Sequence, residues 1–175
     1  ILREVQSLKA MVDEFSRFAR LPSADLSPCD LNAIVLQALA LYDGRRGDAS
    51  ITVDLAPSLP TTSLDAEQMK RVFVNLIENS LEAFGEPSTK NTVKVTTRHD
   101  RARDIIVAEV ADNGKGIAPS DLQKLFQPYF STKGRGTGLG LAIVQRIIGE
   151  HKGKIVAVQN QPKGAKFIIE LPVNG

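Results

Sequence analysis

The chain has 175 residues, of which 42% are hydrophobic and 24% are charged, with a formal net charge of +2. This length and hydrophobic content predict one domain with a full core, and a charge this small without a basic run argues against a nucleic-acid-binding protein. No apolar run reaches the ~20 residues of a membrane span, and a single cysteine, Cys29, excludes an internal disulfide and a Cys-rich zinc site. We therefore expect a soluble protein in a reducing, cytoplasmic setting.

A heptad pattern opens the chain, with apolar residues alternately four and three positions apart: Ile1, Val5, Leu8, Val12, Phe15 and Ala19. The spacing predicts a coiled-coil-like helix with one apolar seam, ended by Leu21-Pro22. The same periodicity fits a partner helix from another chain or a solitary helix packed on its own domain. Residues 22 to 30 are polar, contain prolines and predict a linker.

Residues 31 to 175 predict one α+β domain. Asp30 is an N-cap candidate for a helix that begins at Leu31, and helical periodicity also covers residues 65 to 84 and 139 to 151. β-branched and alternating apolar residues predict five strands, at 50 to 56, 92 to 98, 105 to 111, 154 to 160 and 165 to 171. Two hairpin-like strand pairs with helices between them indicate a two-layer α/β sandwich with a mixed sheet and three main helices.

The helix predicted over residues 65 to 84 carries oxygen ligands on one face. Asp65 with Gln68 indicates an N-cap and its N3 partner. On a helical wheel, the apolar residues lie opposite a polar stripe of Asn75, Glu78, Asn79 and Glu82. Mg²⁺ prefers oxygen ligands and usually takes only one or two from the protein, so one Asn carbonyl would suffice. A solvated helix face would give the same pattern.

Two glycine-rich segments follow, Asp112-Asn113-Gly114-Lys115-Gly116 and the run from Gly134 to Leu141. The first offers a carboxylate beside backbone that bends easily, and the second offers N–H donors for phosphate oxygens. Neither fits the Gly-x-x-x-x-Gly-Lys-Ser/Thr phosphate loop or the Gly-x-Gly-x-x-Gly dinucleotide pattern. The pair predicts a nucleotide site of a third kind, although Asp112 alone would also suit a turn.

Four segments in this order resemble the ATP-binding domain of sensor histidine kinases, in the superfamily that also holds gyrase B, Hsp90 and MutL. Asn75-Leu76-Ile77-Glu78-Asn79 resembles the N box, and Asp112 to Ile117 resembles the first glycine box. Phe126-Gln127-Pro128-Tyr129-Phe130 resembles the F box, and Gly136 to Leu141 resembles the second glycine box. The segments from Leu125 onward are most similar to the nitrogen-regulation NtrB and NtrY type. The resemblance covers about residues 28 to 173.

The resemblance implies a Bergerat-type fold with ATP and Mg²⁺ as cofactors. It implies Asp112 as the acceptor for the adenine amino group and Asn79 as the metal ligand. Asn75 occupies the position of the general base in ATP-hydrolysing relatives; an amide cannot accept a proton as a carboxylate does, which favours transfer over hydrolysis. Lys133 or Arg135 is expected to neutralise phosphate charge. Further nucleotide contacts are expected from Gly114, Gly116, Ile117, Phe130, Thr137, Gly138, Leu139, Gly140 and Leu141.

Four other positions bear on the resemblance. Many relatives carry Lys where this chain has Glu82, and Thr where it has Ala165, and both differences are expected to weaken nucleotide binding. Neither His99 nor His151 lies in the His-Glu-x-x-Asn-Pro context of a phosphoacceptor, so we expect structural roles for both. The substrate histidine is expected on a helix that precedes Ile1, with residues 1 to 21 as the second helix of a dimerisation hairpin.

The resemblance thus implies a catalytic domain, residues 31 to 175, that transfers the ATP γ-phosphate to a histidine on a dimerisation helix. The expected partners are ATP or ADP, that helix, a response regulator and a second copy of the parent protein. Two alternatives stay open, a regulatory nucleotide-binding module and an ATPase clamp of the gyrase or MutL kind; Asn75 and the short chain disfavour the clamp. The start at Ile1 without a signal-peptide pattern favours a piece of a longer protein. We expect this piece to be cytoplasmic, either as part of a cytoplasmic protein or as the cytoplasmic portion of a membrane-bound sensor.

Overall fold

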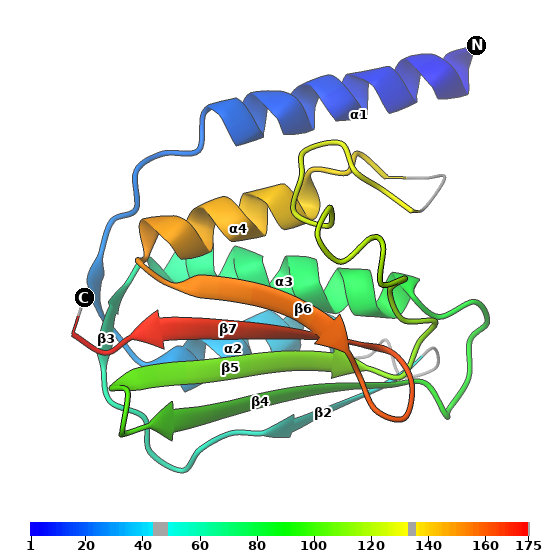
Figure 1. Cartoon of the computed structure of the whole chain (residues 1–175). Helices are drawn as coiled ribbons and strands as arrows, with labels where there is room; N and C mark the ends of the chain where they lie inside the picture. Colours follow the sequence, from blue (N-terminus) through cyan, green and yellow to red (C-terminus); the bar gives the residue numbers. More distant parts are fainter. Residues whose placement is uncertain (44–48, 133–135, 175) are drawn as a thin grey trace.

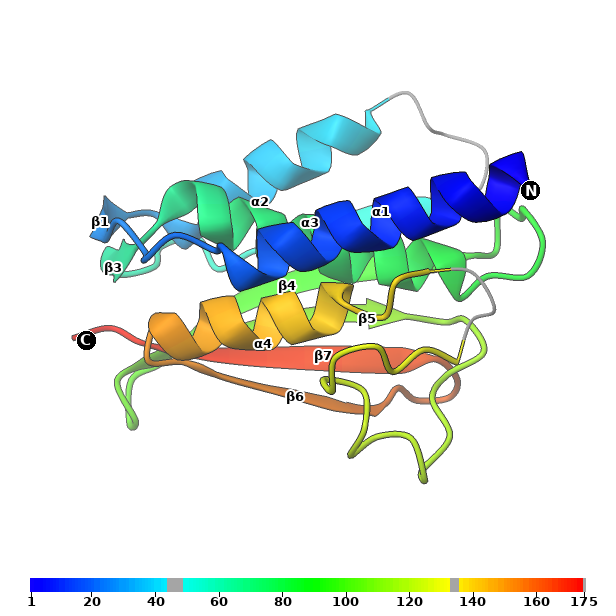
Figure 2. The same ribbon diagram turned by 90° about the horizontal axis from the view of Figure 1, so that it is seen from above.

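The computed structural model describes residues 1–43, 49–132 and 136–174. Its body has two layers, with helices α2 (Leu31–Leu39), α3 (Ala66–Glu82) and α4 (Gly140–Glu150) on one face of a five-stranded sheet (Figure 1). A short 3-10 helix, Ala40–Tyr42, extends α2. Helix α1 (Leu2–Ala19) runs along the outside of the helical layer, as the view from above shows (Figure 2). The predicted α+β sandwich with an N-terminal helix is therefore confirmed.

The large sheet has the strand order β2-β4-β5-β7-β6. Its strands are β2 (Ser50–Asp54), β4 (Thr92–Asp100), β5 (Ile105–Asp112), β6 (Lys154–Gln159) and β7 (Ala165–Pro172). β2 pairs in parallel with β4, and the other neighbours pair antiparallel, so the sheet is mixed as expected. The order places β5 in the centre, and Asp112 ends that strand.

The core lies between the sheet and the three helices. On β7, every second residue is buried, beginning with Ala165 and Phe167, because alternate side chains of a strand point to the same face. On α3, the buried apolar residues include Val72, Leu76 and Ile77, which recur at helical spacing. The polar stripe of α3 is therefore left on the side that does not pack in the core.

Two strands were not predicted from the sequence. β1 (Ser27–Cys29) and β3 (Thr62–Leu64) pair antiparallel in a separate two-stranded sheet. Each has three residues, which is too short to show an alternating pattern. β1 falls inside the segment expected to be a linker, so part of residues 22 to 30 is ordered by pairing with β3.

Both predicted N-caps are confirmed, but one capping box is incomplete. The Asp30 carboxylate accepts from the Asn32 N–H, and the Asp65 carboxylate accepts from the Gln68 N–H at 3.0 Å. The Gln68 side chain does not return the bond, because its Nε2 donates to the Pro22 carbonyl at 2.9 Å. Gln68 therefore ties the chain that leaves α1 to the first turn of α3.

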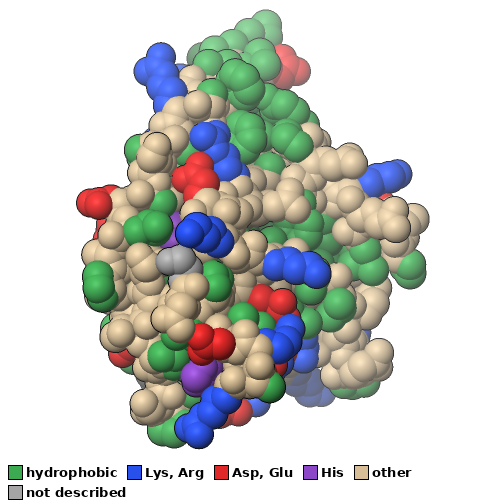
Figure 3. Space-filling model, turned by 60° about the vertical axis from the view of Figure 1, so that its left-hand side comes forward, with side chains coloured by type: hydrophobic (Ala, Val, Ile, Leu, Met, Phe, Trp, Pro, Cys, Tyr) green, Lys and Arg blue, Asp and Glu red, His purple; other side chains and the backbone are tan. Residues whose placement is uncertain are grey.

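Helix α1 contacts the body through its C-terminal half. The ring of Phe15 stacks on Tyr129 at 6.4 Å between centroids, and the Phe18 carbonyl accepts from Arg146 of α4 at 2.6 Å. No α1 residue is buried, and Val5 and Leu8 of the apolar seam are 57% and 61% exposed. Figure 3 shows hydrophobic side chains gathered at the top of the molecule, where α1 lies in Figure 1. Among the described residues, no helix has both the length and the apolarity to cross a membrane.

Candidate functional site

A cavity of about 220 Å³ opens between α3, the start of α4 and the carboxyl end of β5. Polar side chains of α3 form one wall, the two glycine-rich segments form the rim, and apolar side chains complete the lining. The lining residues are Asn75, Glu78, Asn79, Glu82, Ala83, Asp112, Lys115, Gly116, Ile117, Leu125, Phe130, Ser131, Thr132, Thr137, Gly138, Gly140, Leu141, Ala165 and Phe167. Segments far apart in the sequence thus meet around one volume.

The polar stripe of α3 faces this cavity. Asn75, Glu78, Asn79 and Glu82 all line it, and Glu78 also accepts from the Tyr42 hydroxyl at 3.0 Å. The Asn75 amide nitrogen is buried and has no hydrogen-bond partner within the described part of the chain. A buried donor without a partner costs about 1–3 kcal/mol, so this amide would gain from an oxygen acceptor bound in the cavity.

Asp112 lies at the end of the central strand and is 2% exposed. Its Oδ1 accepts from the Gly114 N–H at 2.8 Å and from the Ala165 N–H at 3.2 Å. The bond from Gly114 is the contact of a turn-forming Asp, which was the alternative role for this residue. The bond from Ala165 ties the carboxylate to β7. Two backbone donors thereby fix the orientation of a carboxylate that also lines the cavity.

Two glycines on the rim adopt backbone conformations that disfavour other residues. Gly138 has φ +69°, and a Cβ there would lie 2.6 Å from the Tyr129 carbonyl carbon. Gly116 has φ +77°, and a Cβ there would lie 2.9 Å from Oε1 of Gln159. Gly114 does not line the cavity, because it faces Ala83, whose Cβ would lie 2.8 Å from an added Cβ. Gly114 therefore permits close packing on the C-cap of α3, and its expected nucleotide contact stays a prediction.

The other predicted site residues divide into three groups. Ile117, Phe130, Thr137, Gly140 and Leu141 line the cavity, as do Asn75 and Asn79. Leu139 is fully buried at the N-cap of α4 and lies behind the lining. Lys133 and Arg135 lie outside the described residues.

Several lining residues were not predicted from the sequence. Leu125 and Phe167 supply apolar surface, and Lys115 supplies a cation from the middle of the first glycine-rich segment. The alternating pattern of β7 contained the signal for Phe167, since that residue follows Ala165 on the same face. Ser131 and Thr132 also line the cavity, and no periodicity marks them.

The start of α4 supplies backbone donors. The side chain of the N-cap residue, Leu139, accepts no hydrogen bond from the first turn of α4, which begins at Gly140. The first N–H groups of a helix lack partners inside the helix and carry partial positive charge. Since Gly138 and Gly140 line the cavity, this helix end suits an anion such as a phosphate group.

The α3 wall suits a hard cation. Asn75, Asn79 and Glu82 line one volume, and their side chains carry the amide and carboxylate oxygens that Mg²⁺ prefers. Within the described ranges, no group of three or more His, Cys, Asp or Glu forms a complete metal site. A cation here would need oxygen ligands from a bound molecule as well.

Both histidines have structural contacts. The His151 ring is 4% exposed, its Nε2 accepts from the Asp65 N–H at 2.9 Å, and its Nδ1 lies 2.7 Å from the Ile147 carbonyl oxygen. His99 lies near the far end of β4, where its Nε2 is 3.5 Å from an Asp104 carboxylate oxygen. Neither residue lines the cavity.

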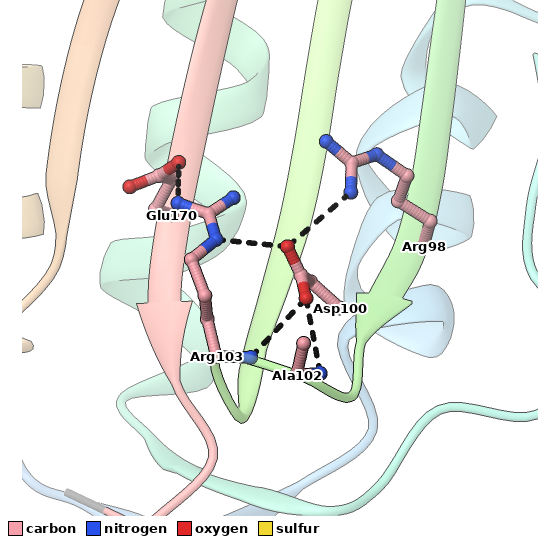
Figure 4. Close-up of polar contacts among 5 residues, drawn as sticks. All are labelled: Arg98, Asp100, Ala102, Arg103 and Glu170. Atoms are coloured by element: carbon pink, nitrogen blue, oxygen red, sulfur yellow. Dashed lines mark hydrogen bonds and ion pairs between the residues drawn. The ribbon is translucent and has the colours of Figure 1, made fainter.

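A charged network stabilises the turn at the end of β4 and β5 remote from Asp112 (Figure 4). Arg103 binds Asp100 at 2.8 Å and Glu170 at 2.9 Å, and Arg98 lies 4.0 Å from Asp100. The Arg103 side chain and the backbone N–H groups of Arg103 and Ala102 hold the pKa of Asp100 below its ordinary value. The carboxylates of Asp100 and Glu170 in turn raise the pKa of Arg103.

Comparison with known proteins gives a family match over most of the body. The profile described as "Histidine kinase-, DNA gyrase B-, and HSP90-like ATPase" matches residues 64–175. Sensor histidine kinase ZraS of Klebsiella oxytoca is 37% identical over 175 residues, covering 99% of this chain and 37% of ZraS. Nitrogen regulation protein NtrY of Azorhizobium caulinodans is 31% identical over 173 residues, covering 98% of this chain and 22% of NtrY. The chain thus spans little more than a third of ZraS.

Solved structures show the same arrangement. The catalytic domain of histidine kinase ThkA has a TM-score of 0.76 and 29% identity, covering 86% of this chain and 97% of that domain. Full-length ShkA in complex with AMPPNP has a TM-score of 0.81 and 27% identity, covering 98% of this chain and 37% of ShkA. ThkA in complex with the response regulator protein TrrA has a TM-score of 0.80 and 26% identity, covering 98% of this chain and 49% of that one.

Proposed function

Since this chain belongs to the family of histidine kinase-, DNA gyrase B- and HSP90-like ATPases, we propose that it is the ATP-binding catalytic domain of a sensor histidine kinase. One observation carries the proposal. The oriented Asp112 carboxylate, the polar face of α3 and the start of α4 surround a single cavity. These are an acceptor for a base amino group, oxygen ligands for a cation and donors for phosphate.

The layout of the cavity supports one direction for the bound nucleotide. Gly114 beside Asp112 packs on Ala83 at the end of α3, whereas a Cβ added at Gly140, at the start of α4, would lie 4.0 Å from Oδ1 of Asn75. Asn75 and Ala83 are about two helical turns apart, or ~12 Å at roughly 1.5 Å per residue. Adenine therefore lies at the Asp112 end, and the phosphates extend toward Asn75 and Gly140.

Asp112 selects the base. Its carboxylate is held by two backbone N–H donors and accepts from the adenine amino group. Guanine carries a carbonyl at the equivalent ring position, which would repel the carboxylate. ATP and ADP therefore bind, and GTP is rejected.

Positioning and charge neutralisation supply most of the catalysis in phosphoryl transfer. When bound, Mg²⁺ neutralises phosphate charge, and Asn79 is its protein ligand. Backbone N–H groups of Gly138 and Gly140 orient the phosphates, and Lys133 or Arg135 adds positive charge. Asn75 cannot accept a proton from water as a carboxylate does, so its amide favours transfer to an acceptor over hydrolysis.

The acceptor is a histidine on a dimerisation helix outside this chain. The exposed apolar seam of α1 supports a role for residues 1 to 21 as the second helix of a dimerisation hairpin, in a homodimeric parent. The phosphoryl group then passes to a response regulator, a step that the complex of ThkA with the response regulator protein TrrA supports by similarity. The domain acts in the cytoplasm, joined to the rest of the sensor.

A transfer assay distinguishes this function from its alternatives. The chain is incubated with γ-labelled ATP, Mg²⁺ and a separately purified hairpin that carries the parent's phosphoacceptor histidine. Acid-labile label on the hairpin identifies a kinase. ATP binding without label identifies a regulatory module, and phosphate release without an acceptor identifies a clamp ATPase.

A further inference from the structure

Three arginines converge on a groove where the end of α1 meets α3. Arg17 and Arg20 belong to the end of α1, and Arg71 belongs to α3. The groove has a volume of about 300 Å³, and its remaining lining residues are Ser16, Leu21 and Pro22. It shares no lining residue with the nucleotide cavity.

Several contacts hold the end of α1 in place beside α3. The Gln68 side chain of α3 donates to the Pro22 carbonyl, and Leu21 between Pro22 and the helix end is 9% exposed. On the other side, Arg146 of α4 donates to the Phe18 carbonyl at 2.6 Å. The three arginines are therefore brought together by packing and hydrogen bonds that belong to the fold.

The positive charges in the groove are only partly balanced by the protein. None of the three guanidinium groups makes a hydrogen bond or ion pair with another residue in the described part of the chain. Burial and the charge of Arg17 lower the pKa of Arg71, and the Glu14 carboxylate has the smaller, opposite effect. Glu14 itself forms no ion pair with another described residue. Like charges that line one groove repel each other, and a bound anion would relieve that repulsion.

We propose that this groove binds a phosphate group, either free or as a phosphate monoester. Guanidinium groups match the oxygens of a phosphate with paired N–H donors, and three of them balance its charge of about −1.5 to −2. Leu21 and Pro22 offer apolar surface to the organic part of an ester. Arg17 lies in the last turn of α1, where the helix dipole stabilises a positive charge. The helix dipole of α1 does not explain why Arg71 of α3 lines the same groove.

Phosphate binding is measured by calorimetry and by thermal unfolding, with inorganic phosphate and phenyl phosphate as probes and chloride at matched ionic strength as the reference. The variants are Arg71→Gln and Arg20→Gln. Arg101→Gln is the matched control, because Arg101 is an exposed arginine in the turn between β4 and β5. Each groove variant should bind phosphate at least about ten-fold more weakly than the wild type and the control, since each removes a charge-assisted contact.

Without phosphate, Arg71→Gln should unfold at the same or a higher temperature than the wild type, because it removes repulsion. A phosphate-dependent rise in unfolding temperature that Arg71→Gln and Arg20→Gln both lose supports the site. Tighter binding of phenyl phosphate identifies an ester as the ligand, and equal binding identifies free phosphate. Equal phosphate affinity in the wild type and both groove variants, or no phosphate binding at all, overturns the proposal.

Discussion

The His151 ring connects the end of α4 to the beginning of α3, because its Nε2 accepts from the Asp65 backbone N–H at 2.9 Å. Its other nitrogen lies 2.7 Å from the Ile147 carbonyl oxygen. Both ring nitrogens are thus engaged in contacts with backbone groups. Helix α4 has 11 residues and is about 16 Å long at ~1.5 Å per residue, which separates His151 from the phosphate end of the cavity.

The isolated chain should therefore not phosphorylate itself. Incubation with ATP and Mg²⁺ should leave no acid-labile phosphate on His99 or His151, because neither lines the cavity where the γ-phosphate would lie. Replacing His151 by Leu should lower the free energy of unfolding by about 1–3 kcal/mol, since the Asp65 N–H loses its acceptor. Label that disappears with His151→Gln or His99→Gln would show that one of these residues is a phosphoacceptor.

The rim of the cavity should be sensitive to a single methyl group at Gly138. Gly138→Ala combines a positive φ with a Cβ 2.6 Å from Tyr129, so the rim must move. We expect a loss of about 1–3 kcal/mol in stability together with weaker ATP binding. The matched control is Gly149→Ala in α4, where an added Cβ meets nothing within 4 Å and should stabilise the helix by about 0.5–1 kcal/mol. If Gly138→Ala and Gly149→Ala had equal effects on the free energy of unfolding and on ATP affinity, this account of Gly138 would be contradicted.

Acid should destabilise the fold through two carboxylates. Burial raises the pKa of Asp65, but hydrogen bonds from the N–H groups of Gln68 and Asp25 bring it below the ordinary 3.8. Contacts with Arg103 likewise lower the pKa of Asp100. Both groups therefore contribute stability above pH 3.8 that is lost as pH falls through their lower folded values. Unfolding temperatures should show a smaller acid-induced fall in Asp100→Asn than in the wild type; parallel curves would exclude Asp100 from this effect.

Asn79→Ala tests the metal role of α3. The variant should lose the Mg²⁺-dependent tightening of ATP binding, while metal-free ADP binding changes less, because the Asn79 oxygen is the proposed ligand of the cation. Titrations of both nucleotides with and without Mg²⁺ make the comparison. Equal losses in all conditions would identify Asn79 as a structural residue.

The sequence was sufficient to predict the elements whose side chains repeat regularly. The helical spacing of Val72, Leu76 and Ile77 defined the buried face of α3 and left Asn75 and Asn79 on the face that lines the cavity. The four ordered motifs then indicated the family that the profile match confirms. Periodicity and short motifs are local properties, so they can be read before the chain is folded.

What could not be predicted depends on contacts between distant segments. Gln68 was expected to complete a capping box, but the Pro22 carbonyl competes for its side chain. The close packing of Gly114 on Ala83, the C-cap of α3, was not predicted from the sequence. The contribution of Leu125 to the cavity likewise follows from packing that no local pattern records.

Titration of the wild type and Asp112→Asn with ATP and GTP tests most directly whether this cavity is an adenine-nucleotide site. The wild type should bind ATP and bind GTP poorly. The variant should bind ATP about ten- to a hundred-fold more weakly, because a hydrogen bond to a charged group is worth roughly 1.5–3 kcal/mol. Unfolding curves would show that the variant remains folded. An unchanged ATP affinity in folded Asp112→Asn would contradict the assignment of this cavity to adenine.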